Sequence, residues 1–302
     1  ASTQLSTPEV LTIDWGNKSL TGLTPPGNLF TALTTKKSLA MVNAGTILLA
    51  EATGAIASFS GGIQTRIAVS GPAQDAADPT LVKLERMVFQ KARNLSDFGG
   101  AFSYAESTSG LGKTPYNEIS ISESVFADNF ARAYGGAAFI DRAVSTTIEG
   151  SLFQNNSTNN NGGALLITRS WKTTLIDTDF IGNQAGISGG AIFVSHLYPS
   201  AIGLSLRSAI PRIEINGYKR HAPISLTIAA REKDVLFDGN SAQSGSDIYL
   251  DLGDFYSYNP HFYTWAAVSA DLNLSASANR TITFNGNIEG EGSYYDLGES
   301  GI

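Results

Sequence analysis

The sequence contains no cysteine, which excludes disulfide frameworks, thiol nucleophiles and cysteine-ligated zinc sites. Charged residues are also scarce, at 16% of 302 residues, and acidic side chains prevail to give a net charge of −7. That sign argues against a general binder of nucleic-acid phosphates. The most apolar stretch, residues 39–59, is interrupted by Asn43 and Glu51, so it is no membrane-spanning helix. We therefore expect no nucleic-acid partner and no membrane insertion within this chain.

Histidine is equally sparse, and its three copies are scattered along the chain as His196, His221 and His261, which favours neither a metal site nor a cofactor. Apolar residues, at 42%, are frequent enough to form a buried core. The chain has 31 glycines and is rich in Ser, Thr and Asn, with few helix formers. This composition predicts an all-β protein.

Two motifs carry an internal repeat. A Phe-x-x-Asn tetrapeptide occurs five times, and its first three copies are 27 residues apart. Nine residues after each of those three phenylalanines comes a Gly-Gly-Ala triplet, which apolar residues follow. The tetrapeptides begin at Phe126, Phe153, Phe180, Phe237 and Phe284 and end at Asn129, Asn156, Asn183, Asn240 and Asn287. The triplets begin with Gly135 and Gly136, Gly162 and Gly163, and Gly189 and Gly190.

A 27-residue period with short apolar runs, punctuated by Asn, Gly and Ser, predicts one turn of a parallel β-solenoid. In coils stacked at about 4.8 Å, the phenylalanines would lie above one another and fill the interior by ring stacking. The asparagines would form a second column at a turn, because Asn tolerates the left-handed conformation and its amide can hydrogen-bond the next coil. The Gly pairs would form tight corners, where a Cβ would clash or φ must be positive.

Two interruptions of this period predict insertions. Phe180 and Phe237 are 57 residues apart, and Phe237 and Phe284 are 47 apart. We place the surplus in loops at about 196–223 and 253–266, and because loops on a rigid scaffold commonly carry recognition, these are the candidate binding segments. The basic candidates are Arg207, Arg212, Lys219 and Arg220; the aromatic candidates are Phe255, Tyr256, Tyr258, Phe262, Tyr263 and Trp265.

Each insertion also has an interpretation without a partner. The basic loop can be merely solvated, and the aromatic loop can fold over the flank of the β-helix and bury its rings there. Residues 1–85 show no clear repeat, and we interpret them as an N-terminal cap, as irregular coils, or as both. The repeat region then spans residues 86–302.

The Gly-Gly-Ala and Phe-x-x-Asn motifs, repeated at constant offset, resemble the passenger repeats of chlamydial polymorphic outer-membrane proteins and related autotransporter surface adhesins. The match covers roughly residues 89–250, and residues 245–249 look like part of the segment that closes such arrays. The resemblance implies a right-handed parallel β-helix exposed at the bacterial outer membrane or secreted. It also implies adhesion to host cells through a surface protein or a glycan.

Carboxylates are candidate catalytic groups, because polysaccharide lyases and hydrolases also use β-helices. Asp177 and Asp179 are two residues apart, and an ordinary solvated position on a strand is the alternative to a catalytic or calcium-binding pair. A second set is Asp247, Asp251 and Asp254. Position-matched residues on successive coils form no acidic column: Gly150 separates Glu123 from Asp177, and the row of Val125, Leu152 and Asp179 contains one carboxylate. This disfavours a lyase.

The leading hypothesis is therefore a non-catalytic, cofactor-free adhesin passenger that binds through its insertions. The alternative is a structural or self-associating surface protein, since open β-helix ends can stack chain on chain. A glycan-cleaving enzyme is the third and disfavoured hypothesis.

Overall fold

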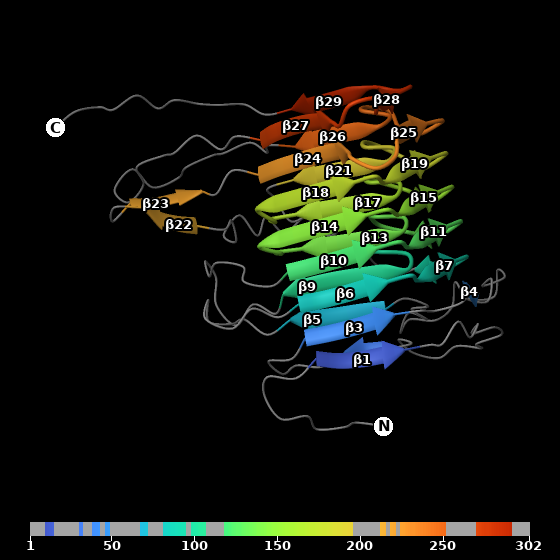
Figure 1. Cartoon of the computed structure of the whole chain (residues 1–302), viewed down its shortest axis with the longest axis vertical. Helices are drawn as coiled ribbons and strands as arrows, with labels where there is room; N and C mark the ends of the chain where they lie inside the picture. The colour runs from blue at the N-terminus through green and yellow to red at the C-terminus, as the bar shows by residue number, and fades with distance from the viewer. Residues whose placement is uncertain are drawn as a thin grey trace.

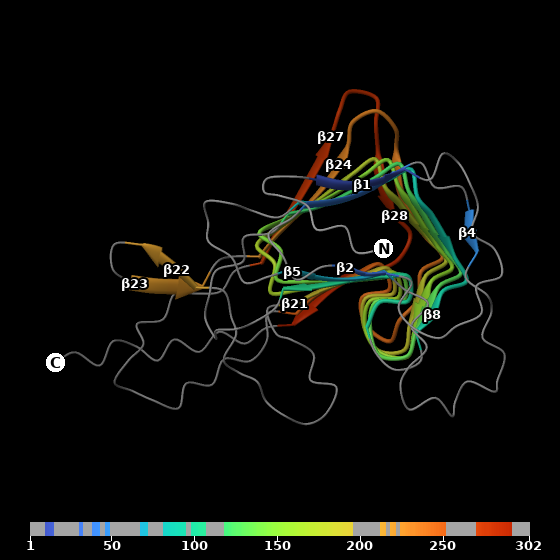
Figure 2. The ribbon, with the colours of Figure 1, turned by 90° about the horizontal axis from the view of Figure 1, so that it is seen from below.

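The computed structural model describes residues 10–14, 30–32, 38–42, 46–48, 67–71, 81–94, 98–106, 118–195, 212–215, 218–221, 224–251 and 270–291. Every regular element in these ranges is a strand. Four parallel sheets run along the molecule, and the chain passes from one to the next in stacked coils (Figure 1). Seen along the axis, the coils overlie one another around a common interior (Figure 2). The expected all-β parallel β-helix is confirmed.

Each regular coil contributes one strand to each sheet, and we number the sheets in chain order. Sheet 1 contains β1 (Val10–Asp14), β3 (Ser38–Val42), β6 (Leu81–Glu85), β10 (Glu118–Ser122), β14 (Ser145–Glu149), β18 (Lys172–Ile176), β24 (Ile224–Ala230) and β27 (Ala270–Ala276). Sheet 2 contains β4 (Thr46–Leu48), β7 (Val88–Gln90), β11 (Val125–Ala127), β15 (Leu152–Gln154), β19 (Asp179–Ile181), β25 (Val235–Asp238) and β28 (Ile282–Phe284).

The remaining two sheets complete the coil. Sheet 3 is short and contains β8 (Arg93–Asn94), β12 (Phe130–Ala131), β16 (Ser157–Thr158) and β20 (Gln184–Ala185). Sheet 4 contains β2 (Phe30–Ala32), β5 (Ile67–Gly71), β9 (Phe102–Glu106), β13 (Ala138–Asp141), β17 (Leu165–Thr168), β21 (Ile192–Ser195), β26 (Ile248–Asp251) and β29 (Ile288–Glu291). An antiparallel hairpin of β22 (Arg212–Ile215) and β23 (Tyr218–His221) lies outside these sheets.

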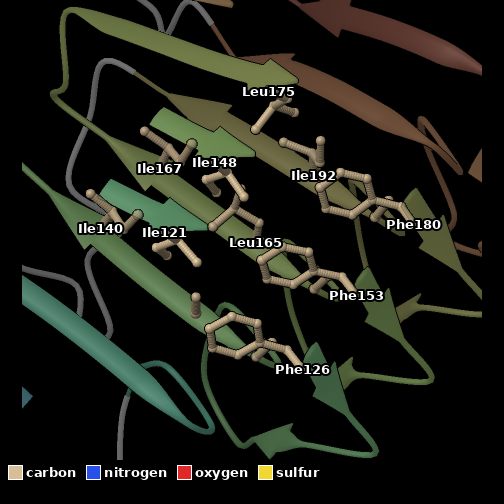
Figure 3. Close-up of a cluster of buried hydrophobic side chains, with 14 of the residues drawn as sticks. Ile121, Phe126, Ile140, Ile148, Phe153, Leu165, Ile167, Leu175, Phe180 and Ile192 are labelled. Carbon is tan, nitrogen blue, oxygen red and sulfur yellow. The ribbon is translucent and has the colours of Figure 1, made fainter. Parts of the chain in front are cut away.

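The interior is built from columns of identical or similar side chains. Phe126 stacks on Phe153 with ring centroids 4.7 Å apart, and Phe153 stacks on Phe180 at 5.0 Å. The column extends to Phe89 at one end and through Phe237 to Phe284 at the other. Figure 3 shows its rings facing aliphatic side chains from the other sheets. The ring column expected from the repeat is therefore present, and it forms one side of the core.

Four of the five motif asparagines, Asn129, Asn156, Asn183 and Asn240, form the expected ladder of buried amides. The Asn156 Oδ1 accepts hydrogen bonds from the backbone N–H and the Nδ2 of Asn129, at 3.1 and 2.9 Å. Its own Nδ2 donates to the Phe126 carbonyl and to the Asn183 Oδ1. The backbone conformation differs from the expectation, because the left-handed residue is the one before each of the four buried asparagines. Asn155 has a φ of +52°, for example.

The Gly pairs form the corner between sheets 3 and 4. Gly162 has a φ of +72°, a conformation that an L side chain rarely adopts. A Cβ on its neighbour Gly163 would overlap the carbonyl oxygen of Gly190 in the next coil. The first Gly of the pair therefore supplies the turn and the second allows two coils to approach.

A hydroxyl ladder that sequence analysis missed lies at the corner between sheets 1 and 2. Ser151 Oγ accepts from the Ser124 backbone N–H at 3.1 Å, and Thr178 Oγ1 accepts from the Ser151 N–H at 3.4 Å. All three side chains are buried. Their 27-residue spacing was visible in the sequence, but the alternation of Ser and Thr conceals it among many surface hydroxyls.

The described strands of the first 85 residues continue the same sheets. β1 pairs in parallel with β3, and β3 with β6, so sheet 1 extends toward the N-terminus. β2 and β5 extend sheet 4 in the same way. Whether a cap covers them falls on residues outside the described ranges.

Candidate functional site

Long connections leave the β-helix at the corner between sheets 4 and 1. β21 ends at Ser195 and β24 begins at Ile224; β26 ends at Asp251 and β27 begins at Ala270. Residues 107–117 likewise connect β9 with β10. In two other coils the connection from sheet 4 to sheet 1 is short. Residues 142–144 connect β13 with β14, and residues 169–171 connect β17 with β18. The two predicted insertions thus begin and end at the same corner of the β-helix, which we call the insertion edge.

The two predicted insertions leave from neighbouring strands. β21 and β26 pair in parallel, with Ser195 opposite Asp251. The Ser195 Oγ donates a 3.0 Å hydrogen bond to the Asp251 Oδ2. The residue before one insertion is therefore bonded to the residue before the other. Sequence spacing indicated two loops, and the fold places their starting points side by side.

Polar side chains also occupy the same row of sheet 4 in the preceding coils. Asp141 and Thr168 precede Ser195 and Asp251 in the same register row of sheet 4. The Asp141 carboxylate accepts from Thr168 Oγ1 at 2.9 Å and from the Arg169 Nε at 2.7 Å, and a second Arg169 nitrogen completes a bidentate ion pair. Asp141 is 2% exposed and Arg169 6%. A buried bidentate pair fixes geometry strongly, because removing either partner strands a charge.

Three of the four basic candidates lie in the hairpin that projects beside the insertion edge (Figure 2). Its register places Arg212 opposite His221, Ile213 opposite Arg220 and Glu214 opposite Lys219. Arg207 and the six aromatic candidates lie outside the described residues. Residues 196–223 hold four Lys or Arg and one Glu, a charge of +3, so the remaining chain carries −7 − 3 = −10.

The paired carboxylates have structural partners. Asp177 is buried and has a φ of +49°, and its carboxylate accepts from the backbone N–H groups of Arg231 and Glu232, at 2.6 and 3.0 Å. Asp179 accepts from the Leu236 backbone N–H and from the Lys233 Nζ, both at 2.9 Å. The interpretation of Asp177 as a solvated strand residue is wrong, because it is a turn residue that binds a loop from the next coil.

A shallow groove of about 750 Å³ runs beside Asp177 along the corner between sheets 1 and 2. Charged residues of both signs line it, and the Lys83 and Arg86 side chains pair with Glu85. The hydrogen bond from Lys83 is the main reason that the pKa of the Glu85 carboxyl lies below its usual range. Within the described ranges, no three His, Asp or Glu side chains converge as metal ligands would.

The two described members of the second set of carboxylates lie at opposite ends of β26. Asp247 precedes β26 and is fully buried, whereas Asp251 ends that strand at the insertion edge. Asp254 lies outside the described residues. The Asp247 carboxylate accepts from Asn240 Nδ2 and from the Gly286 backbone N–H, at 2.9 and 2.8 Å. It therefore terminates the Asn ladder and binds the last coil to it.

Comparison with known protein families finds a match for segments of two coils. Residues 150–168 and 177–195 each match the Chlamydia polymorphic membrane protein repeat. The chain carries repeats of this type. The matched segments run from the hydroxyl ladder through the Phe, Asn and Gly positions to the end of a sheet 4 strand. No curated protein and no solved structure matches the chain.

The polymorphic membrane protein repeat suggests a surface-exposed passenger region of an outer-membrane protein, and the chain resembles this family in the two matched segments. No helix of the described part is long and apolar enough to cross a membrane. The buried rings, amides and hydroxyls account for the repeat residues as scaffold. The insertion edge is then the candidate functional site.

Proposed function

We propose that this chain is the passenger region of a bacterial surface adhesin and binds a host-cell protein or glycan through its insertion edge. The observation that carries the proposal is the hydrogen bond between Ser195 and Asp251, which joins the starting points of the basic and the aromatic insertion. Adjacent basic and aromatic segments combine charge steering with ring contacts, the chemistry of binding hot spots and of sugar stacking.

The function that we propose involves no catalysis. The candidate catalytic carboxylates, Asp177 and Asp179, already accept hydrogen bonds from backbone N–H groups and from the Lys233 side chain. A catalytic acid or base needs a lone pair or proton directed at a substrate. These carboxylates instead position a loop. Release of reducing ends from a panel of polysaccharides would contradict this part of the proposal.

The test replaces each insertion by the short connection of a neighbouring coil. Thr168 pairs with Ser195 and Lys172 pairs with Ser225, so residues 169–171 are the natural substitute for residues 196–224. The same three residues can replace residues 252–270, because Ser225 pairs with Asp271. Both variants should retain the β-sheet circular dichroism of the parent, since each receives a connection that the fold already uses.

Binding of the labelled chain to epithelial cells is then measured for the parent and for each variant. We expect saturable binding by the parent and at least a tenfold weaker affinity in one or both variants. A matched control shortens neither loop but exchanges Ile187, an exposed residue away from the insertion edge, for Lys. Unchanged binding in the double replacement would overturn the assignment of function to this edge.

A further inference from the structure

An Asn-Gly pair, Asn285-Gly286, lies in the last described coil directly after β28. In an Asn-Gly pair the backbone nitrogen of Gly can attack the preceding side-chain amide with little hindrance, because Gly has no side chain. The sequence contains two more such pairs, Asn161-Gly162 and Asn216-Gly217, and the second of these lies outside the described residues. Two Asn-Gly pairs can therefore be compared in their folded surroundings.

A buried carboxylate accepts the hydrogen bond of the attacking group at Gly286. The Gly286 backbone N–H donates to the Asp247 Oδ2 at 2.8 Å, and Asp247 is fully buried. A Cβ at position 286 would overlap the Ser246 Oγ and lie 3.0 Å from the Asp247 Cγ, so this approach requires Gly. Burial raises the pKa of the Asp247 carboxyl, which makes its carboxylate a stronger proton acceptor. A base therefore lies within reach of the proton that the attack must remove.

The side-chain amide of Asn285 is held in place as well. The Asn285 Nδ2 donates to the Asp238 Oδ1 at 2.9 Å, and the Asn285 backbone N–H donates to the Phe237 carbonyl at 3.0 Å. Asn285 is exposed, so water can reach it. The leaving nitrogen, the attacking nitrogen and the base are thus all fixed by hydrogen bonds in one place.

The Asn161-Gly162 pair meets a different acceptor. The Gly162 backbone N–H donates to the Ser188 carbonyl of the next coil at 3.0 Å. The Asn161 Oδ1 accepts from the Ser188 backbone N–H at 3.2 Å. A backbone carbonyl is a far weaker base than a carboxylate. The same dipeptide therefore faces a base in one coil and a poor proton acceptor in another.

We propose that Asn285 is a site of spontaneous deamidation, with Asp247 as the general base. The Asp247 Oδ2 accepts the Gly286 amide proton while the Gly286 nitrogen forms a bond to the Asn285 Cγ. The Cγ–Nδ2 bond then breaks, and the amide nitrogen leaves as ammonia with the proton that Asp247 returns. The product is a cyclic succinimide, which water opens at either carbonyl to give aspartate or isoaspartate at position 285.

Both products weaken the attachment of the last described coil. The amide that donated to Asp238 becomes a carboxylate, so two like charges then face each other. Isoaspartate also adds one carbon to the main chain before β29, which displaces that strand relative to its partner β26. The modification is irreversible, so the modified fraction should increase with the age of the protein. This property is separate from the binding proposed at the insertion edge.

The test compares the folded chain with the same chain unfolded in guanidinium chloride at neutral pH. Trypsin cleaves after Arg142, Arg169 and Arg280, so Asn161 and Asn285 lie in separate peptides whose fragment masses report deamidation. We expect Asn285 to react about tenfold faster in the folded chain, because the positioned base acts only there. Asn161 should react more slowly in the folded chain than in the unfolded one.

Asp247→Asn tests the base, because an amide oxygen can still accept from the Gly286 N–H but cannot remove its proton. In the folded variant we expect the reaction of Asn285 to slow about tenfold, and unfolded variant and unfolded parent should react alike. Asp271→Asn neutralises an exposed carboxylate of the same coil and is the matched control, which should react like the parent. Circular dichroism shows whether both variants fold.

The pH profile separates a base from a merely structural role of Asp247. In an unfolded chain hydroxide removes the proton, so the rate should rise steadily with pH. In the folded parent the rate should level off above the pKa of the Asp247 carboxyl, which the neighbouring charge of Asp238 also raises. Folded Asp247→Asn should lose this plateau.

Two results would overturn the proposal. The first is an Asn285 that reacts no faster in the folded chain than in the unfolded one. The second is an undiminished reaction in folded Asp247→Asn. The double insertion replacement should react like the parent, so loss of cell binding and loss of deamidation are separate outcomes.

Discussion

A coil in the middle of this β-helix has a described neighbour on both sides, whereas the last described coil, with β27, β28 and β29, has one on one side only. Ile148 and Leu274 stand in the same register row, but Ile148 is fully buried and Leu274 is half exposed. Phe153 and Phe284 differ in the same way. Identical repeat positions thus have different energies, because burial in a solenoid comes from nearest neighbours and not from the repeat itself.

The hydrogen bonds follow the same rule. Asn156 bonds with asparagines of the coils on both sides of it. Asn287 occupies the corresponding motif position of the last coil, but its side chain is exposed and meets only Glu289, at 3.4 Å. A motif residue therefore stabilises the fold only where another coil completes its contacts.

Truncation of the ring column should show the largest difference between the two regions. Phe153→Ala removes a ring stacked on both faces and should lower the free energy of unfolding by about 3–5 kcal/mol. Phe284→Ala removes a ring with one stacked face and should cost less than about 2 kcal/mol. Urea unfolding in dilute solution, followed by circular dichroism, measures both. Equal losses would show that the last coil is covered as fully as the middle.

Removal of ladder amides should give a smaller difference of the same sign. Asn156→Ala leaves the Asn129 backbone N–H and the Phe126 carbonyl without these partners, and should cost about 2–4 kcal/mol. Asn287→Ala should change stability by no more than about 0.5 kcal/mol, because its side chain is exposed. The same urea titration applies. If Asn156→Ala left the free energy of unfolding unchanged, water would be replacing the amide and the ladder would not hold the coils together.

The sequence predicted the repeat scaffold well because each motif residue contacts its own counterpart one coil away. A periodic column of Phe, Asn or Gly requires no knowledge of distant segments. The left-handed turn residue was assigned one position too late, because Asn favours that conformation in isolation. In the ladder its amide instead bridges coils, and residues such as Asn155 take the turn.

Contacts between residues that lie on either side of an insertion could not be predicted from the period. Asp177 accepts from Arg231 and Glu232, which lie beyond the first insertion in the sequence. The shared edge of the two insertions depends on which strands carry them, and spacing alone gives only their lengths. The unusual position of Asp247, by contrast, could have been recognised in the sequence. It precedes Ile248 as Ala191 precedes its register partner Ile192, so a carboxylate replaces the repeat alanine.

This replacement offers the subtlest test of the contrast between the middle and the end of the molecule. Burial raises the pKa of the Asp247 carboxyl, although the hydrogen bonds from Asn240 and Gly286 act in the opposite direction. A raised pKa in the folded state means that the folded protein binds the proton more tightly than the unfolded chain does. The stability that Asp247 contributes is then complete below the ordinary aspartate range and is lost as pH rises through the raised folded value.

The free energy of unfolding of the parent, minus that of Asp247→Ala, should therefore fall as the pH is raised from the acid range toward neutrality. Urea titrations at a series of pH values give this difference, and Asp271→Ala, which removes an exposed carboxylate from the last coil, serves as the control. A difference that grows with pH would show the opposite balance: the two N–H donors would then outweigh desolvation. In that case the charged carboxylate would hold the last coil to the ladder most firmly at neutral pH, and the end of the β-helix would be secured by charge where its middle is secured by amides.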